Sequence, residues 1–156
     1  MAQTSKVGHI IATLRTALAT ESTFRVVNVW RDNYVDDKTL IYPFVQGAVY
    51  SGMYQAQAFQ SSDGIATVGI MCNKTTTADT DGSGTTTEEM GIALRKIEKA
   101  LYDYDVEGVA ANNDGTFTTK LQGWVVDQHD GHYDIADGKI QFAVQVSVMF
   151  THHRNT

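Results

Sequence analysis

The acidic segment Asp79–Gly84 contains the residue types that bind calcium in proteins. Its sequence, Asp-Thr-Asp-Gly-Ser-Gly, matches the opening of an EF-hand loop, in which carboxylate and hydroxyl oxygens coordinate the ion. The match then fails, because the twelfth position needs a bidentate carboxylate and holds Met90, while Glu89 falls one place early. We therefore predict a polar loop here, and the sequence leaves open whether this loop ever binds a cation.

Two pairs of histidines, His129 with His132 and His152 with His153, carry side chains that often bind zinc. A zinc site needs three or four ligands in tetrahedral geometry. The first pair is expected in a connection between two strands, and the second in a C-terminal tail where the side chains diverge. No third ligand is evident, so we predict neither a metal site nor any other cofactor.

Catalytic motifs are absent from the sequence. It contains no G-x-S-x-G, no H-E-x-x-H, no phosphate-binding loop and no dinucleotide fingerprint. Cys72 ends the apolar run Ile70-Met71-Cys72, where a cysteine is usually a small buried hydrophobe and not a nucleophile. Several acids are expected in turns, where such residues shape the backbone: Asp103, Asp105, Asp127, Asp130, Asp134 and Asp137. The sequence therefore predicts that the protein is not an enzyme and has no catalytic residues.

Length and composition are those of one folded domain spanning residues 1–156. The hydrophobic fraction of 42% is sufficient for a core that needs no disulfide or metal. The net charge is -6 and the 12 basic residues are scattered, which argues against a general nucleic-acid binder. A single cysteine excludes an internal disulfide and fits folding in a reducing cytoplasm. No apolar stretch resembles a signal peptide or approaches the ~20 residues that cross a bilayer.

Two segments have the periodicity of amphipathic helices. Residues 4–19 place apolar side chains on one face, and a second helix is expected from Glu88 to Tyr102. Thr86 and Glu89 have the spacing of a capping box at its start. Both helices are expected to pack on a sheet.

The rest of the chain has the pattern of strands joined by polar turns and loops. Residues 139–151 alternate strictly between apolar and other side chains, as a strand with one buried face does. Its expected partner is 116–127, across a connection formed by 128–138. Further strands are expected at 24–30, within 39–57 and at 66–72, with a turn at Ser62–Gly64 and a polar loop at 74–87. The only proline, Pro43, indicates an edge or strand-start position.

This order of elements predicts an α+β fold. We expect a mostly antiparallel sheet, two amphipathic helices packed on one of its faces, and a long C-terminal β-hairpin.

Aromatic and apolar residues are frequent in the expected loops and arms. Single exposed aromatics are normal, but several in extended arms favour a protein–protein interface. The residues that we expect at such an interface are Tyr34, Val35, Tyr50, Tyr54, Tyr133, Ile135, His152 and His153. The chain is therefore expected to assemble with other protein subunits.

Short segments along nearly the whole chain carry a resemblance to a known family. They are, in order, Ile10-Ile11 and Leu14–Leu18 in the first helix, Val29-Trp30-Arg31, Tyr42–Val45, the strand Ala66–Cys72, the helix Met90–Leu101 with Tyr102-Asp103, Val106–Val109, and Gly138–Phe150. In pattern and order the chain resembles the tail terminator, or tail-completion, proteins of tailed bacteriophages. The resemblance lies in the succession of elements and not in an invariant motif.

The resemblance implies a structural virion protein that forms a hexameric ring at the head-proximal end of the tail tube. Such a ring stops tube elongation and joins the tail to the neck or head. Its partners would be further copies of this chain, the tail tube protein, a neck or head-completion protein and, in a contractile tail, the sheath protein. DNA would pass through the bore without specific binding, and no membrane would be involved.

The protein would be assembled in the host cytoplasm and located in the virion, in the tail or neck. Two alternatives stay open at this point: another virion assembly component, such as a neck, head-completion or baseplate protein, and a calcium-binding module. The sequence does not identify which residues contact tube, sheath or neck, or whether the tail contracts.

Overall fold

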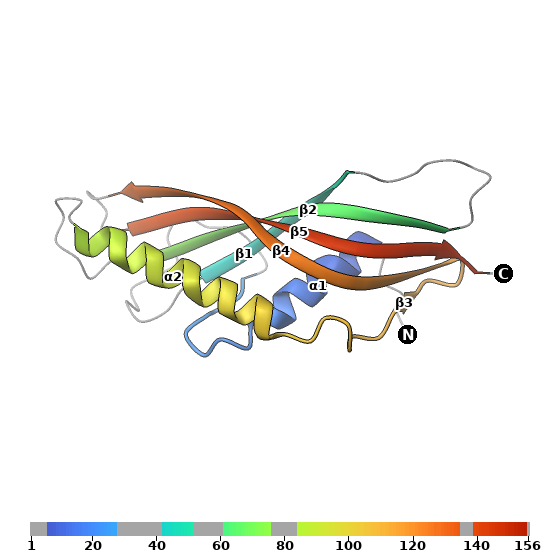
Figure 1. Ribbon diagram of the computed structural model, residues 1–156. Coiled ribbons are helices and arrows are strands. Elements are labelled where there is room, and N and C mark those ends of the chain that lie inside the picture. Colours follow the sequence, from blue (N-terminus) through green and yellow to red (C-terminus); the bar gives the residue numbers. More distant parts are fainter. Residues whose placement is uncertain (1–5, 28–41, 52–60, 76–83, 135–138, 156) are drawn as a thin grey trace.

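The computed structural model describes residues 6–27, 42–51, 61–75, 84–134 and 139–155 (Figure 1). Two helices and five strands follow one another as α1 (Lys6–Leu18), β1 (Tyr42–Ser51), β2 (Ser61–Thr75), α2 (Gly84–Asp103), β3 (Asn112–Asn113), β4 (Phe117–Asp134) and β5 (Lys139–Arg154). The strands form one curled sheet in the order β1-β2-β5-β4-β3, and every neighbouring pair is antiparallel. The predicted α+β fold with a C-terminal hairpin is confirmed.

The core lies between one face of the sheet and the two helices, which Figure 1 shows on the same side. Strands β2 and β5 supply alternate residues to it, as the period of two requires. The fully buried strand side chains are Ala66, Val68, Ile70 and Cys72 from β2 and Val144, Val146, Val148 and Phe150 from β5. The helices cover them with Ile10, Leu14, Ala17 and Leu18 from α1 and Ala93, Leu94, Ile97 and Leu101 from α2.

The hairpin of β4 and β5 is the longest feature of the sheet. Its pairing runs from Phe117 opposite Arg154 to Asp134 opposite Lys139. The register shifts twice, between Leu121 and Gly123 and again after Val126. Shifts of this kind are β-bulges, which bend a strand and increase its twist, and Figure 1 shows β4 crossing over the sheet near its middle.

The predicted connection 128–138 is wrong for its first seven residues. Residues 128–134 continue β4 and pair with β5, so His129 and His132 lie in a strand and not in a loop. The acids Asp127, Asp130 and Asp134 are likewise strand residues. The polar residues of this segment are typical of a turn, but its main chain pairs with β5.

Strand β2 and helix α2 are also longer than predicted. The predicted turn Ser62–Gly64 is wrong, because β2 begins at Ser61 and pairs with β5 over its whole length to Thr75. The predicted capping box is also wrong, because α2 begins at Gly84 and therefore contains both Thr86 and Glu89.

The predicted strand at 24–30 is not a strand over its described part, 24–27. Phe24 is buried in the core, and Val27 makes a single parallel bridge to Phe44 of β1. The amide of Val27 donates to the carbonyl of Pro43 at 3.0 Å. This segment is therefore held by Phe24 and Val26 in the core and by the bridge at Val27, and residues 28–30 lie outside the described part of the chain.

Candidate interaction surfaces

Most of the residues predicted for an interface lie where the structure gives no side-chain position. Tyr34, Val35, Tyr54 and Ile135 are outside the described residues. Tyr50 belongs to β1, where it pairs with Ala66. Tyr133 belongs to β4 and pairs with Ile140, so the prediction that it lies in the hairpin connection is wrong.

His152 and His153 do not form a free tail. Both belong to β5 and pair with β4 on one side and β2 on the other. The Nδ1 atom of His152 lies 2.8 Å from Oγ1 of the buried Thr119, and its ring stacks on Phe117 with centroids 4.6 Å apart. His152 is therefore part of the fold, whereas His153 is exposed and available for a contact.

The end of the hairpin is held by Asn155. Its amide nitrogen donates to the carbonyl of Thr116, its Nδ2 donates to Oδ1 of Asn113, and its Oδ1 accepts from the hydroxyl of Thr118, all at 2.6–2.7 Å. In the adjoining turn, Asp114 accepts the amides of Phe117 and Thr116, and these hydrogen bonds lower the pKa of its carboxyl group. At this end of the molecule, hydrogen bonds therefore join the end of β5 to β3, to β4 and to the turn between them.

The outer face of the sheet, opposite both helices, is built from uncharged residues along its central rows. Ile65 of β2 lies beside Met149 of β5, and Val125 of β4 lies beside Ser147. Ile65 is 41% exposed and Val125 is 45% exposed. A sheet face in contact with water usually carries polar and charged side chains, so the exposed Ile65 and Val125 make this face a candidate contact surface.

The two edges of the sheet are different strands. On the β1 side, the described main-chain contact is the Val27 amide on Pro43. On the β4 side, β3 pairs only with Thr118 and Thr119. Among the described strands, none pairs with the rest of this β4 edge, from Lys120 to Asp134.

The C-terminal turn of α2 lies against this part of β4. The indole Nε1 of Trp124 donates to the carbonyl of Leu101 at 2.6 Å, and Tyr104 stacks on the indole with centroids 6.0 Å apart. The amide of Val126 donates to the hydroxyl of Tyr102 at 3.2 Å. Three contacts therefore fix the end of the helix to one short stretch of strand.

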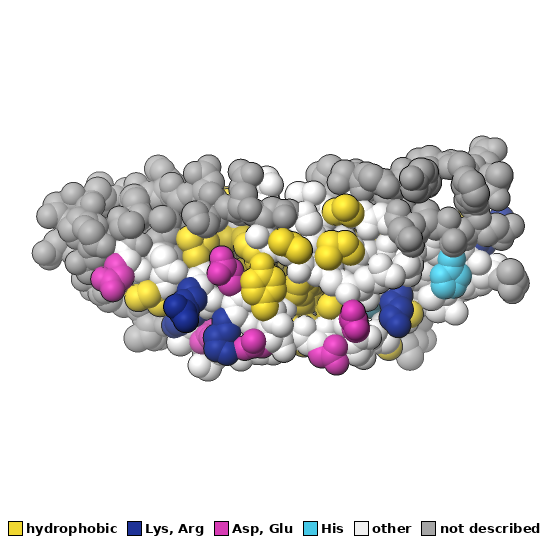
Figure 2. All heavy atoms as spheres, in the orientation of Figure 1, with side chains coloured by type: hydrophobic (Ala, Val, Ile, Leu, Met, Phe, Trp, Pro, Cys, Tyr) yellow, Lys and Arg dark blue, Asp and Glu magenta, His cyan; other side chains and the backbone are white. Residues whose placement is uncertain are grey.

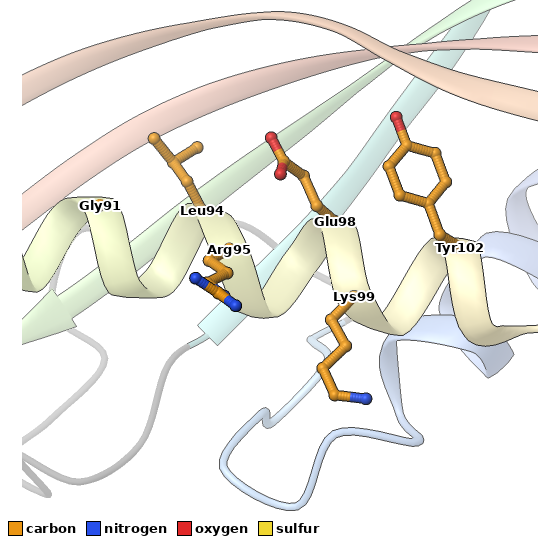
Figure 3. Close-up of a pocket in the computed structure, with 6 residues that line it drawn as sticks. All are labelled: Gly91, Leu94, Arg95, Glu98, Lys99 and Tyr102. Atoms are coloured by element: carbon orange, nitrogen blue, oxygen red, sulfur yellow. The ribbon is translucent and has the colours of Figure 1, made fainter.

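An open hollow extends along α2 from this point. It is lined by Gly91, Leu94, Arg95, Glu98, Lys99 and Tyr102. In Figure 3, Leu94, Glu98 and Tyr102 point from the helix toward the strands, whereas Arg95 and Lys99 point away. Figure 2 shows hydrophobic side chains gathered at the centre of this side of the molecule, above a row of charged ones. Lys99 forms an exposed ion pair with Asp103.

Several of the candidate metal-binding and catalytic residues of the sequence can be located in the described part of the chain. Its residues form no group of three or more His, Cys, Asp or Glu side chains that could hold a metal ion. Cys72 is buried as predicted, and burial raises the pKa of its thiol. Asp105 forms a turn by accepting the amide of Gly108. Of the calcium-like segment, residues 79–83 lie outside the described residues and Gly84 begins α2.

No protein-family model and no curated protein matches this chain. Neither of the described helices has the length and apolar character needed to cross a membrane.

Sequence reasoning missed the outer face and the contact of Tyr102 with β4. A signal for the face was present, since Ala143, Gln145, Ser147 and Met149 alternate with the core residues of β5 and none is charged. The Tyr102 contact had no such signal, because it depends on where the end of α2 packs against β4 in the folded chain.

Proposed function

We propose that this protein is a structural component of a bacteriophage virion that acts as a tail terminator. Copies of the chain form a ring, a hexamer by resemblance to that family, at the head-proximal end of the tail tube. The ring stops tube elongation and joins the tail to the neck or head. The observation that carries the proposal is a single sheet in which no described strand pairs with β4 from Lys120 to Asp134, together with the exposed apolar side chains Ile65 and Val125 on the outer face.

Unlike edges favour a ring over a closed pair. A cyclic assembly needs a heterologous contact, in which one surface of a subunit meets a different surface of its neighbour. Open strand edges present unpaired amides and carbonyls, and proteins use them for strand addition. Strand β1 lies at one end of the strand order, and at the other end the two residues of β3 cover only Thr118 and Thr119 of β4. Contact between these two sides of the sheet would leave a new side of each kind exposed until the ring closes.

The remaining surfaces suit the other partners of the proposed ring. The uncharged outer face and the exposed His153 are available to the tail tube protein, a neck or head-completion protein and, in a contractile tail, the sheath protein. The net charge of -6 suits a bore through which DNA passes without being held, because phosphates are repelled. A bore lined by Lys and Arg would contradict this part of the proposal.

The direct test is to add the purified protein to growing tail tubes. We expect elongation to stop and electron micrographs to show one ring on a single end of each tube. Tubes that grow to unlimited length in the presence of excess protein would overturn the proposal. Rings that bind to heads or baseplates but not to tubes would favour one of the other virion assembly roles.

A further inference from the structure

The turn between β3 and β4 contains an Asp-Gly pair, Asp114-Gly115, whose chemistry the proposed function does not use. In such a pair the main-chain nitrogen of the glycine can attack the side-chain carboxyl carbon of the aspartate. The new C–N bond closes a five-membered succinimide, and the hydroxyl of the carboxyl group leaves as water with the proton of the nitrogen. Water then opens either carbonyl of the succinimide, which restores aspartate or gives isoaspartate, with one more methylene in the main chain. Glycine favours the attack because it has no side chain to crowd the nitrogen.

Both reacting groups are engaged in hydrogen bonds in the folded turn. Oδ1 of Asp114 accepts the amides of Thr116 at 2.9 Å and Phe117 at 2.6 Å, and these bonds lower the pKa of the carboxyl group and keep it ionised. An ionised carboxylate has no hydroxyl to lose as water, so it reacts only after it gains a proton. The amide of Gly115 donates to Oδ1 of Asn113 at 2.9 Å, so its nitrogen must leave this acceptor before it can attack.

Asn155, which follows β5, holds the acceptor of the Gly115 amide in place. Its Nδ2 donates to the same Oδ1 of Asn113 at 2.7 Å, and its Oδ1 accepts from the hydroxyl of Thr118 at 2.6 Å. Its main-chain nitrogen donates to the carbonyl of Thr116 at 2.7 Å. Three hydrogen bonds from one residue therefore tie the turn to the end of β5, which lies beside β3 (Figure 1).

We propose that Asp114 is a modification site that stays latent while Asn155 is docked on the turn and isomerises to isoaspartate when Asn155 is released. This inference goes beyond the proposed function and does not depend on it. The added methylene changes the geometry of the turn that the 3.0 Å hydrogen bond from the Asp114 amide to the carbonyl of Phe117 closes. The isoaspartate therefore accumulates as a record of how often the end of β5 has separated from the turn.

The experiment compares Asn155→Ala with the matched control His153→Ala. His153 is exposed, lies in the same strand end and makes none of the hydrogen bonds of the turn. Each folded protein is incubated in mildly acidic buffer and digested, and liquid chromatography with mass spectrometry separates the Asp114 peptide from its isoaspartate isomer. The two side-chain hydrogen bonds of Asn155 correspond to roughly a fivefold to hundredfold change in the opening of the turn. We expect Asn155→Ala to form isoaspartate at Asp114 at least about fivefold faster than the unaltered chain, and His153→Ala to match the unaltered chain.

Two Asp-Gly pairs within strands report whether a variant has lost its whole fold. Asp63-Gly64 lies in β2 and Asp130-Gly131 lies in β4, and both pair with β5. Their isomerisation requires the strands to separate, so we expect it to stay slow in all three folded proteins. In urea, where the strands are lost, these pairs and Asp114 should react at similar rates. A faster reaction at Asp114 alone therefore locates the change at the turn.

Three results would overturn the inference. Isomerisation of Asp114 that is as fast in the folded, unaltered chain as in urea would mean that the turn gives no protection. Equal rates in Asn155→Ala and His153→Ala would mean that Asn155 does not control the reaction. A parallel increase at Asp63 and Asp130 would assign the effect to global unfolding. The tail terminator stands or falls separately, by the addition of the protein to growing tubes.

Discussion

The two faces of strand β5 are built for different tasks. The face toward the helices carries Val144, Val146, Val148 and Phe150, and none of these side chains has any exposed surface. The opposite face carries Ala143, Gln145, Ser147 and Met149, which are smaller or more polar yet uncharged, and only Gln145 among them is exposed. The first face resembles an ordinary core. The second resembles neither a core nor a strongly charged surface. Under the proposed function, folding and assembly would use opposite sides of the same strand.

The largest expected effect tests this division at two adjacent residues. Phe150→Ala removes a fully buried ring and should lower the free energy of unfolding by about 3–5 kcal/mol. Met149→Ala, on the other face, should lower it by about 1 kcal/mol or less, because that side chain is only partly buried. Urea denaturation of both variants measures the difference, and equal losses would break the comparison.

A second adjacent pair tests the strand beside β5. Trp124→Phe leaves the buried carbonyl of Leu101 without its donor and should cost about 1–3 kcal/mol of stability. Val125→Thr lies on the outer face, where Val125 is 45% exposed, and should change stability by about 0.5 kcal/mol or less. Denaturant midpoints measured side by side distinguish the two variants. A larger loss of stability for Val125→Thr would contradict the assignment of Trp124 to the core and Val125 to the outer face.

The closed turn at the end of the hairpin should add a small dependence of stability on pH. The folded pKa of Asp114 is lowered by the amides of Phe117 and Thr116, so its ionised form stabilises the fold above the ordinary value of 3.8. This contribution is lost as the pH falls below 3.8 through the lowered folded value. Asp114→Asn should therefore be less stable than the unaltered chain at neutral pH, and the difference should close in acid. A difference in stability between the two proteins that grows in acid would contradict the stabilising role of the ionised Asp114.

A small effect on stability, but a clear effect on assembly, is expected from the outer face. Ile65→Thr combined with Val125→Thr keeps β-branched side chains while removing apolar surface. The free energy of unfolding should therefore change by about 1 kcal/mol or less. If this face is buried between proteins, assembly should require about tenfold more protein. Ile92→Thr on α2, where Ile92 is 51% exposed, is the matched control. Equal effects of the double variant and of Ile92→Thr on assembly would mean that the outer face takes no part in subunit contacts.

The sequence was sufficient to predict those parts of the fold that are specified by side-chain burial. The alternation along β5, the two amphipathic helices and the buried Cys72 were all recognisable, because each follows from which residues avoid water. The segments 61–65 and 128–134 were not, because their polar residues resemble turns and the pairing with β5 is made by the main chain.

The locations of two predicted interface residues were wrong for the same reason. Tyr133 was expected in a loop and His152 in a tail, and both are strand residues. Which part of the β4 edge lacks a described partner strand depends on strand order, and no local sequence pattern encodes strand order. The Tyr102 contact depends likewise on where α2 packs against β4.

The enclosed thiol of Cys72 gives the molecule a built-in reporter. It is the only cysteine of the chain and has no exposed surface. A thiol reagent can therefore modify the folded chain only during moments when helices and sheet separate, and the rate of labelling counts those openings. If contacts with neighbouring subunits make these openings rarer, labelling of Cys72 should slow on assembly. A cysteine engineered on the surface would react with the reagent while the buried Cys72 does not compete for it.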